Sequence, residues 1–214
     1  GVIARHAHMV NGMSQPRGTS ISQLDADLKK ALDDPAAESI VLWVDSPGGS
    51  VDGLVDMADR IARARGKKPI VTLASGMMAS AAYWLGSQTD RVYATRGTVI
   101  GSIGVITWVV DDHRAYEQEG YDVRYITTGA AKAAGASGKT QTPEDFDTIR
   151  DEINGWYQLF VDAVAKARGI DAERARQLAD GRVHLAAAAL ELGLIDEIAD
   201  EASLFDSLRE RAPS

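Results

Sequence analysis

The sequence contains no cysteine in its 214 residues. This absence excludes a disulfide scaffold, a zinc site built on thiolates and a cysteine nucleophile. No apolar run reaches about 18 residues, so we expect no membrane span in this chain. Basic residues are in deficit, with 23 Lys and Arg against 31 Asp and Glu. That balance disfavours a nucleic-acid partner, because nucleic-acid-binding proteins normally carry a basic excess on the binding face.

The N-terminus also lacks the charged-then-apolar pattern of a signal peptide. Gly1-Val2-Ile3 reads like the middle of a strand, so an anchor or propeptide could be missing upstream. Apolar residues make up 45% of the chain, enough to bury a sizeable core. The length is that of one ordinary domain, and we find no internal repeat and no linker.

Strand, turn and helix alternate through the first two thirds of the chain. Expected strands cover residues 39–44, 69–74, 91–94 and 122–127, with a polar loop over 8–20 and helices around Leu24–Leu32, Val51–Ile61 and Ala79–Leu85. This order predicts an α/β fold with a parallel sheet. The apolar run at 39–44 is typical of a strand buried on both faces.

The last third is expected to be mostly helical. An apolar stripe predicts one long helix from Pro143 to Arg168, ended by Gly169, and shorter helices are expected after Asp171 and over 186–192. We therefore expect one domain over 1–214, with a core of about 1–127, a Gly/Ala/Lys loop at 128–141 and a helical arm over 142–214.

The first candidate site is the turn Asp45-Ser-Pro-Gly-Gly-Ser50. Two glycines after a strand let the backbone approach a ligand and turn peptide N–H groups outward, where they can stabilise a developing negative oxygen. The alternative is a plain glycine-rich turn with Ser50 as a helix cap. The turn is not a P-loop, because the GK[ST] ending is absent.

The second candidate is Ser80, where an expected strand passes into an expected helix within the segment 75–83. A serine at such a junction can present its hydroxyl beside a free N–H, as in a nucleophile elbow, although the G-x-S-x-G pattern is absent. The alternative is a helix cap or a small packing residue.

A nucleophilic serine needs a base, and none of the four histidines has an evident orienting partner. His6 and His8 lie two apart on a strand edge without a third metal ligand, His113 should be solvated, and His184 should lie in a structural turn. Lysine is the other possibility. Lys132 lies among small uncharged residues, where burial would lower its pKa, and Lys139 is its rival.

Six segments occur in a characteristic order. They are Asp45–Ser50, Met78–Tyr83, Gly101-Ser-Ile-Gly-Val105, Gly129-Ala-Ala-Lys132, Ala179–Val183 and Gly193-Leu-Ile-Asp-Glu197. Together they resemble the S49 serine peptidases, a family that includes bacterial signal peptide peptidase A and phage capsid-maturation proteases. The resemblance covers essentially the whole chain.

The resemblance implies a Clp-protease/crotonase-like fold and a Ser–Lys dyad with an acyl-enzyme mechanism. Carried over by motif, Ser80 is the nucleophile and Lys132 is the general base. The oxyanion hole is then the N–H of Gly49, with Gly48 as a further candidate, together with that of Ala81.

Ser102 is a candidate for supporting the dyad. The resemblance implies no metal, no nucleotide and no other cofactor. It also implies a homo-oligomer that cleaves peptides or unfolded protein segments, such as remnant signal peptides or phage capsid and scaffold proteins. The expected location is cytoplasmic or virion-associated for a phage-type member, and membrane-associated if an anchor has been removed.

Two departures from the family pattern stand out. Ser80-Ala81-Ala82-Tyr83 is closer to the phage-type members than to the signal peptide peptidases, and the segment 133–139 replaces a usual proline-containing turn. Two other functions stay open at this point. A crotonase-like acyl-CoA enzyme would share the fold, and a non-catalytic capsid-associated assembly protein could have retained it.

Overall fold

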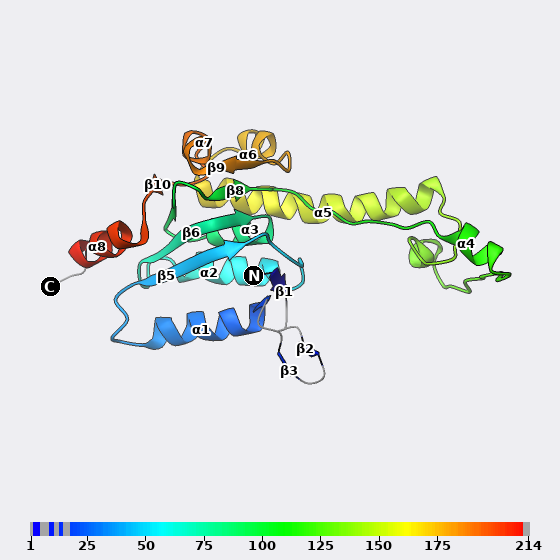
Figure 1. The fold of residues 1–214 in the computed structure, drawn as a ribbon, viewed down its shortest axis with the longest axis horizontal. Coiled ribbons are helices and arrows are strands. Elements are labelled where there is room, and N and C mark those ends of the chain that lie inside the picture. The colour runs from blue at the N-terminus through cyan, green and yellow to red at the C-terminus, as the bar shows by residue number, and fades with distance from the viewer. Residues whose placement is uncertain (1, 5–8, 11–12, 15–17, 212–214) are drawn as a thin grey trace. The chain divides into compact units, whose positions relative to one another are not determined.

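The computed structural model describes residues 2–4, 9–10, 13–14 and 18–211. Contacts within the chain divide it into two compact units, the first made of Gly1–Gly104 with Leu159–Ser214 and the second of Val105–Gln158 (Figure 1). The prediction of a single domain over 1–214 stays a prediction.

A six-stranded sheet forms the centre of the first unit. Its strands are β5 (Ile40–Ser46), β6 (Ile70–Ala79), β7 (Arg91–Ala94), β8 (Val99–Gly101), β9 (Val183–Leu185) and β10 (Glu197–Ile198). The order is β10-β7-β6-β8-β9, with β5 also paired to β6, and every pairing is parallel except that of β8 with β9. The predicted α/β class with a parallel sheet is confirmed.

The N-terminal segment contributes short strands outside this sheet. They are β1 (Val2–Ala4), which is parallel to β4 (Gly18–Ser20), and β2 (Met9–Val10), which is antiparallel to β3 (Met13–Ser14). The prediction of a loop over 8–20 was therefore wrong for the described part of that segment, because these backbone groups pair in ladders.

The helices of the first unit include those predicted around Leu24–Leu32 and Val51–Ile61. They are α1 (Ile21–Asp33), α2 (Leu54–Ala64), α3 (Ala81–Gly86), α6 (Ala172–Leu178), α7 (Ala186–Glu191), α8 (Glu201–Arg211) and the end of α5 (Pro143–Arg168). Helix α1 begins where the Ser20 hydroxyl accepts the Gln23 N–H, and Asp171 caps α6 in the same way.

Alternate residues of β6 face different helices, because side chains of a strand alternate between the two faces of a sheet. The Thr72 hydroxyl donates to the carbonyl of Gly86 in α3 at 2.8 Å. Val71 and Leu73 point the other way and form a buried cluster with Leu204 of α8. Helix α3 thus lies against one face of the sheet and α8 against the other.

Helix α3 is covered in turn by the end of α5. The rings of Trp84 and Phe160 stack with centroids 4.5 Å apart, and Val161 and Val164 are fully buried beside Phe160 in sequence. A helix of six residues is too short to be stable alone. Its packing between the sheet and α5 therefore holds the segment that follows Ser80.

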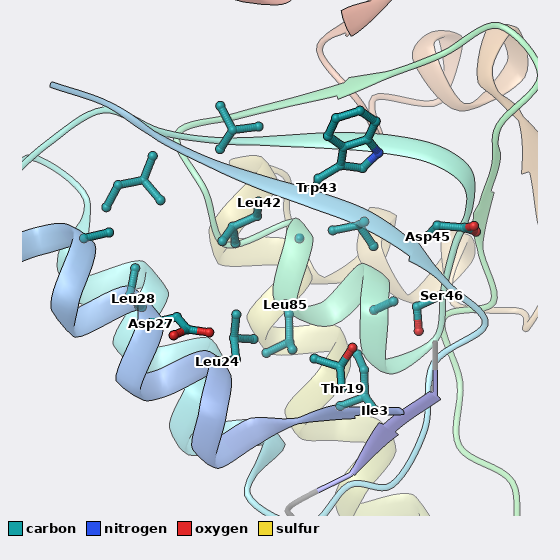
Figure 2. Close-up of a pocket in the computed structure, with 16 residues that line it drawn as sticks. Ile3, Thr19, Leu24, Asp27, Leu28, Leu42, Trp43, Asp45, Ser46 and Leu85 are labelled. Carbon is teal, nitrogen blue, oxygen red and sulfur yellow. The ribbon is translucent and has the colours of Figure 1, made fainter. Parts of the chain in front are cut away.

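The sequence predicted that the strand at 39–44 is buried on both faces, and for β5 this prediction was wrong. Trp43 is 54% exposed, and among the described residues β5 pairs only with β6. Figure 2 shows Leu42 and Trp43 on opposite sides of the strand, with Leu42 directed toward Leu24 and Leu28 of α1. These leucines line a hollow of about 530 Å³ between α1, α3 and β5.

The second unit contains α4 (His113–Gln118), a short 3-10 helix η1 (Ala130–Ala133) and the first part of α5. The strand predicted over 122–127 is absent, since Tyr121–Thr127 has no regular structure and most of its side chains are exposed. Among the described residues no strand pairs with this segment, so it has no ladder to join. The long helix predicted over 143–168 is confirmed.

Helix α5 is 26 residues long but carries many charged residues. None of the helices in the described part of the chain combines the length and apolar character required to cross a bilayer.

The end of α5 is tied to the segment that leads into β10. The Arg168 guanidinium makes two hydrogen bonds to the Asp196 carboxylate at 2.8 and 2.9 Å and a third to the Gly193 carbonyl. Asp196 also accepts the Val92 N–H of β7 at 2.7 Å. Burial opposes ionisation of Asp196, but these hydrogen bonds outweigh it and hold the pKa of the carboxyl below its usual value.

We expect Arg168→Ala to lower the free energy of unfolding by about 2–4 kcal/mol, because it strands a half-buried carboxylate. Arg209→Ala is the control, since Arg209 and Asp206 are both well exposed, and it should cost less than about 1 kcal/mol. Denaturant titration at neutral pH measures both. Equal losses would contradict a structural role for the Arg168 pair.

The same pair predicts a dependence of stability on pH. A carboxyl whose pKa is lower in the folded state stabilises the protein above its unfolded value of about 3.9, and loses this effect as the pH falls through the folded value. Asp196→Asn should therefore reduce stability at pH 7 and flatten its decline in this acid range. An unchanged acid decline would mean that other groups dominate it.

Candidate active site

Three turns that are far apart in sequence meet at the carboxyl ends of β5, β6 and β8. The Ser80 N–H donates to the Gly101 carbonyl at 2.8 Å, which joins the end of β6 to the end of β8. A Cβ atom on Gly48 would lie 2.8 Å from Ser80 Cβ and 3.1 Å from the Ala81 nitrogen. The glycine turn after β5 therefore lies directly against Ser80.

Strand β6 extends further than the sequence predicted. It passes through Ser75-Gly76 and continues to Ala79, so the expected turn at Gly76 and the helix start at Ala79 were both wrong. The strand pairs with β7 up to Ala74 and then with β8 from Met77 to Ala79. The strand does not turn at Gly76 because its pairing with β8 continues the backbone hydrogen bonding to Ala79.

Ser80 has an unusual backbone conformation between β6 and α3. Its φ is 53° and its ψ is −126°, a combination that costs a non-glycine residue about 1–3 kcal/mol. Ser80 precedes the first turn of α3, yet its side chain makes no cap hydrogen bond there. The helix-cap interpretation of Ser80 is therefore disfavoured. A serine on a sharp, strained strand-to-helix turn is the geometry of a nucleophile elbow.

Two backbone N–H groups beside Ser80 are suited to bind a negative oxygen. Ala81 is the first residue of α3, so its N–H has no acceptor within the helix. Gly49 lies between Gly48, whose carbonyl accepts the Ile3 N–H, and Ser50, whose N–H donates to the Ile3 carbonyl. Because neighbouring residues of an extended chain point in opposite directions, the Gly49 N–H points away from β1.

Gly48 is a weaker donor candidate than Gly49. Its N–H donates to the Ser46 hydroxyl at 3.2 Å. Both glycines are required for close approach of the backbone, since a Cβ atom on Gly49 would lie 1.9 Å from the Ile3 carbonyl oxygen. The sequence did not indicate the role of Ser46, although its position two residues before Gly48 is typical of a serine that hydrogen-bonds a nearby amide.

Ser102 lies one residue after the acceptor of the Ser80 N–H. It shares with Ser80 a positive φ, 52°, and among the described residues these two are the only non-glycine residues with one. Its N–H donates to the Arg182 carbonyl at 2.6 Å. The structure thus places Ser102 at the same end of the sheet as Ser80.

Lys132 belongs to the second unit. It lies in the 3-10 helix η1. The sequence predicted that its side chain is packed among small residues, but the side chain is exposed. Lys139 contacts the buried carboxylate of Asp145, and this ion pair holds the pKa of Asp145 below its usual range. An ammonium bound to a carboxylate is not available as a base, so the structure favours Lys132 over Lys139.

The histidines differ in part from expectation. His113 has a carboxylate partner that the sequence did not indicate, because its Nδ1 lies 2.5 Å from Asp111. His184 lies in β9 and not in a turn. His6 and His8 lie outside the described residues.

Comparison with known proteins gives matches to two protein families. Residues 62–213 match the family model described as Peptidase family S49, and residues 19–100 match that described as Clp protease. An Enterococcus faecium protein that carries the name signal peptide peptidase SppA is 32% identical over 86% of this chain and 54% of its own length. Capsid assembly protease C of Escherichia phage lambda is 30% identical over 90% of this chain and 44% of its own.

A solved structure supports the fold. It is the 1510-N membrane-bound stomatin-specific protease, in a lysine-to-alanine form with a substrate peptide, at a TM-score of 0.57 and 19% identity, covering 87% of this chain and 72% of that one. The chain spans about half the length of the curated relatives named above. It has a Clp-protease-like α/β fold and belongs to peptidase family S49.

Proposed function

We propose that the protein is a serine endopeptidase in which Ser80 is the nucleophile and Lys132 is the general base. The observation that carries this proposal is the strained backbone of Ser80 against the glycine turn at Gly48. Strain of this kind persists only where the surrounding structure holds it, and it is concentrated at functional sites. A purely scaffolding protein would gain nothing from it.

In this proposal the neutral Lys132 amine takes the proton of the Ser80 hydroxyl, and Ser80 Oγ attacks the peptide carbonyl carbon. The carbonyl oxygen becomes an oxyanion, which accepts hydrogen bonds from the N–H groups of Gly49 and Ala81. One such donor is typically worth about 3–4 kcal/mol of transition-state stabilisation. Lys132 then returns the proton to the leaving amine, and water hydrolyses the resulting ester by the same steps.

Ser102 is the candidate for supporting this dyad. Its positive φ and its position next to Gly101, the acceptor of the Ser80 N–H, support that role. The proposal involves no metal and no cofactor. The peptidase alternative is favoured over an acyl-CoA enzyme because a serine on a strained elbow serves nucleophilic catalysis, which acyl-CoA chemistry at paired N–H groups does not need.

The proposed substrates are taken from the names of the relatives. One relative is named a signal peptide peptidase and another a capsid assembly protease, so we propose cleavage of remnant signal peptides or of capsid and scaffold segments by a homo-oligomer. The matching location is the membrane for the first substrate class, and the cytoplasm or virion for the second. Hydrolysis rates on a synthetic signal peptide and on an unfolded capsid scaffold distinguish the two classes.

The central test is labelling of the protein with a fluorophosphonate probe, read by mass spectrometry alongside casein hydrolysis. We expect labelling at Ser80, none in Ser80→Ala, and a loss of about 100- to 10,000-fold in Lys132→Ala. Lys139→Ala should retain most of the activity, because Lys139 is paired with Asp145. A folded sample without labelling would refute the proposal, and the reverse order of the lysine variants would move the base to Lys139.

The glycine turn gives a second prediction. Gly48→Ala places a methyl group against Ser80, so we expect about a 100-fold loss of kcat from misplacement of the nucleophile. Gly97→Ala is the matched control, because in the described structure its added methyl group meets no atom within 4 Å beyond its own residue and its two chain neighbours. Thermal unfolding of both variants separates misplacement from misfolding. Wild-type kcat in Gly48→Ala would show that the close approach is unnecessary.

A further inference from the structure

The loop that carries Lys132 is ordered by a series of short turns within the second unit. The N–H of Lys132 donates to the Gly129 carbonyl at 3.2 Å, that of Ala134 to Ala131 at 3.1 Å, and that of Ala136 to Ala133 at 3.2 Å. Ala133 is buried at 6% exposure. Each turn shares residues with the next, so the place of Lys132 depends on where residues 136–138 are held.

Residues 137 and 138 are held by one carboxylate from another part of the chain. The Gly138 N–H donates to Asp112 Oδ1 at 2.6 Å, and the Ser137 hydroxyl donates to Asp112 Oδ2 at 2.5 Å. The Tyr125 hydroxyl adds a bond to the Ser137 carbonyl at 2.7 Å. Hydrogen bonds to an ionised acceptor are roughly twice as strong as neutral ones.

The backbone at Gly138 leaves no room for a larger residue. Gly138 has a φ of 74°, and a Cβ atom there would lie 2.8 Å from a methyl group of Val123. The Gly138 N–H hydrogen bond, together with the one from Ser137, holds the pKa of Asp112 below its ordinary value. The carboxylate is therefore ionised at neutral pH.

The Asp112 side chain binds these two residues and does not cap its own helix. It occupies the cap position of α4, where an aspartate side chain ordinarily accepts an N–H of the first turn. Its carboxylate makes no such cap bond and instead binds residues 25 and 26 positions further along the chain. Helix α4 has no buried residue, so these bonds do not protect a core beneath it.

We infer that Asp112 is a positioning residue for the general base, which fixes the Lys132 loop through Ser137 and Gly138. This inference rests on the proposed role of Lys132. Asp112 touches neither substrate nor the reacting atoms, so its loss should act on the catalytic step through the placement of Lys132 and leave peptide binding unchanged.

The test compares Asp112→Ala and Asp112→Asn in the full chain with Asp122→Asn. Asp122 is the matched control, because its well exposed carboxylate binds Arg124, two residues away. We expect Asp112→Ala to lower kcat about 10- to 100-fold with KM unchanged, and Asp112→Asn, which keeps one acceptor, to lie between it and the wild type. Asp122→Asn should retain both constants.

Two further readouts separate positioning from general damage. Fluorophosphonate labelling of Ser80 should slow by the same factor as kcat, because labelling needs an activated serine but no bound peptide. Hydrogen exchange at the Gly138 amide should accelerate in Asp112→Ala. A folded Asp112→Ala variant with wild-type kcat and labelling would overturn the inference, and so would a loss shared equally by Asp122→Asn.

The outcome for Lys132 keeps the two proposals apart. If Lys132→Ala is labelled at the wild-type rate, the proposed dyad is wrong. If Lys132→Ala loses labelling while Asp112→Ala keeps it, the dyad stands and only the role of Asp112 is wrong.

Discussion

The strained backbone of Ser80 is the constraint on which the candidate site depends. A non-glycine residue at φ 53° requires support from its surroundings, and three elements supply it. The last ladder of β6 with β8 fixes the residue before it, the Gly101 carbonyl binds its N–H, and α3 continues from it under the cover of Phe160. Gly48 completes the arrangement, because only a residue without a side chain fits beside it.

The proposed base has a support of a different kind. Lys132 lies on a loop of short backbone turns, and side chains that bind backbone groups of the loop support these turns. Asp112 binds two of its residues, and the Gln141 amide binds Gly135 and the carbonyls of Ala136 and Lys139. The proposed nucleophile is thus held by ladders and packing, whereas the loop of the proposed base is held by polar side chains as well as by its own turns. Polar contacts of this kind depend on the charge state of the groups that make them.

The sequence predicted the elements whose signal is local. The helix from Pro143 to Arg168 and the short strand Arg91–Ala94 have the predicted bounds, and a helix follows Asp171 as predicted. Their signals, which are apolar spacing, a capping residue and β-branched content, act over a few residues. The α/β class followed from the same alternation. The motif resemblance indicated the family, and it brought Gly48 and Ser80 into one candidate site before the fold was known.

The errors came from partners that a single segment cannot show. The end of β6 was misplaced because its continuation depends on β8. The strand predicted over 122–127 was wrong because no strand in the described part of the chain pairs with that segment. The exposure of Trp43 depends on what covers β5. Asp112 was missed for the same reason, since its partners lie 25 and 26 residues away and nothing in the local pattern of Asp111-Asp112 indicates them.

Strand β6 changes its neighbour from β7 to β8 along its length, so its two halves have different roles. Up to Ala74 the strand lies between β5 and β7, whereas from Met77 onward β8 takes the place of β7 and the strand leads to Ser80. Natural variation can therefore act on the two halves separately. Substitutions in the second half act on the end of the sheet that carries Ser80, while the first half continues to specify the architecture.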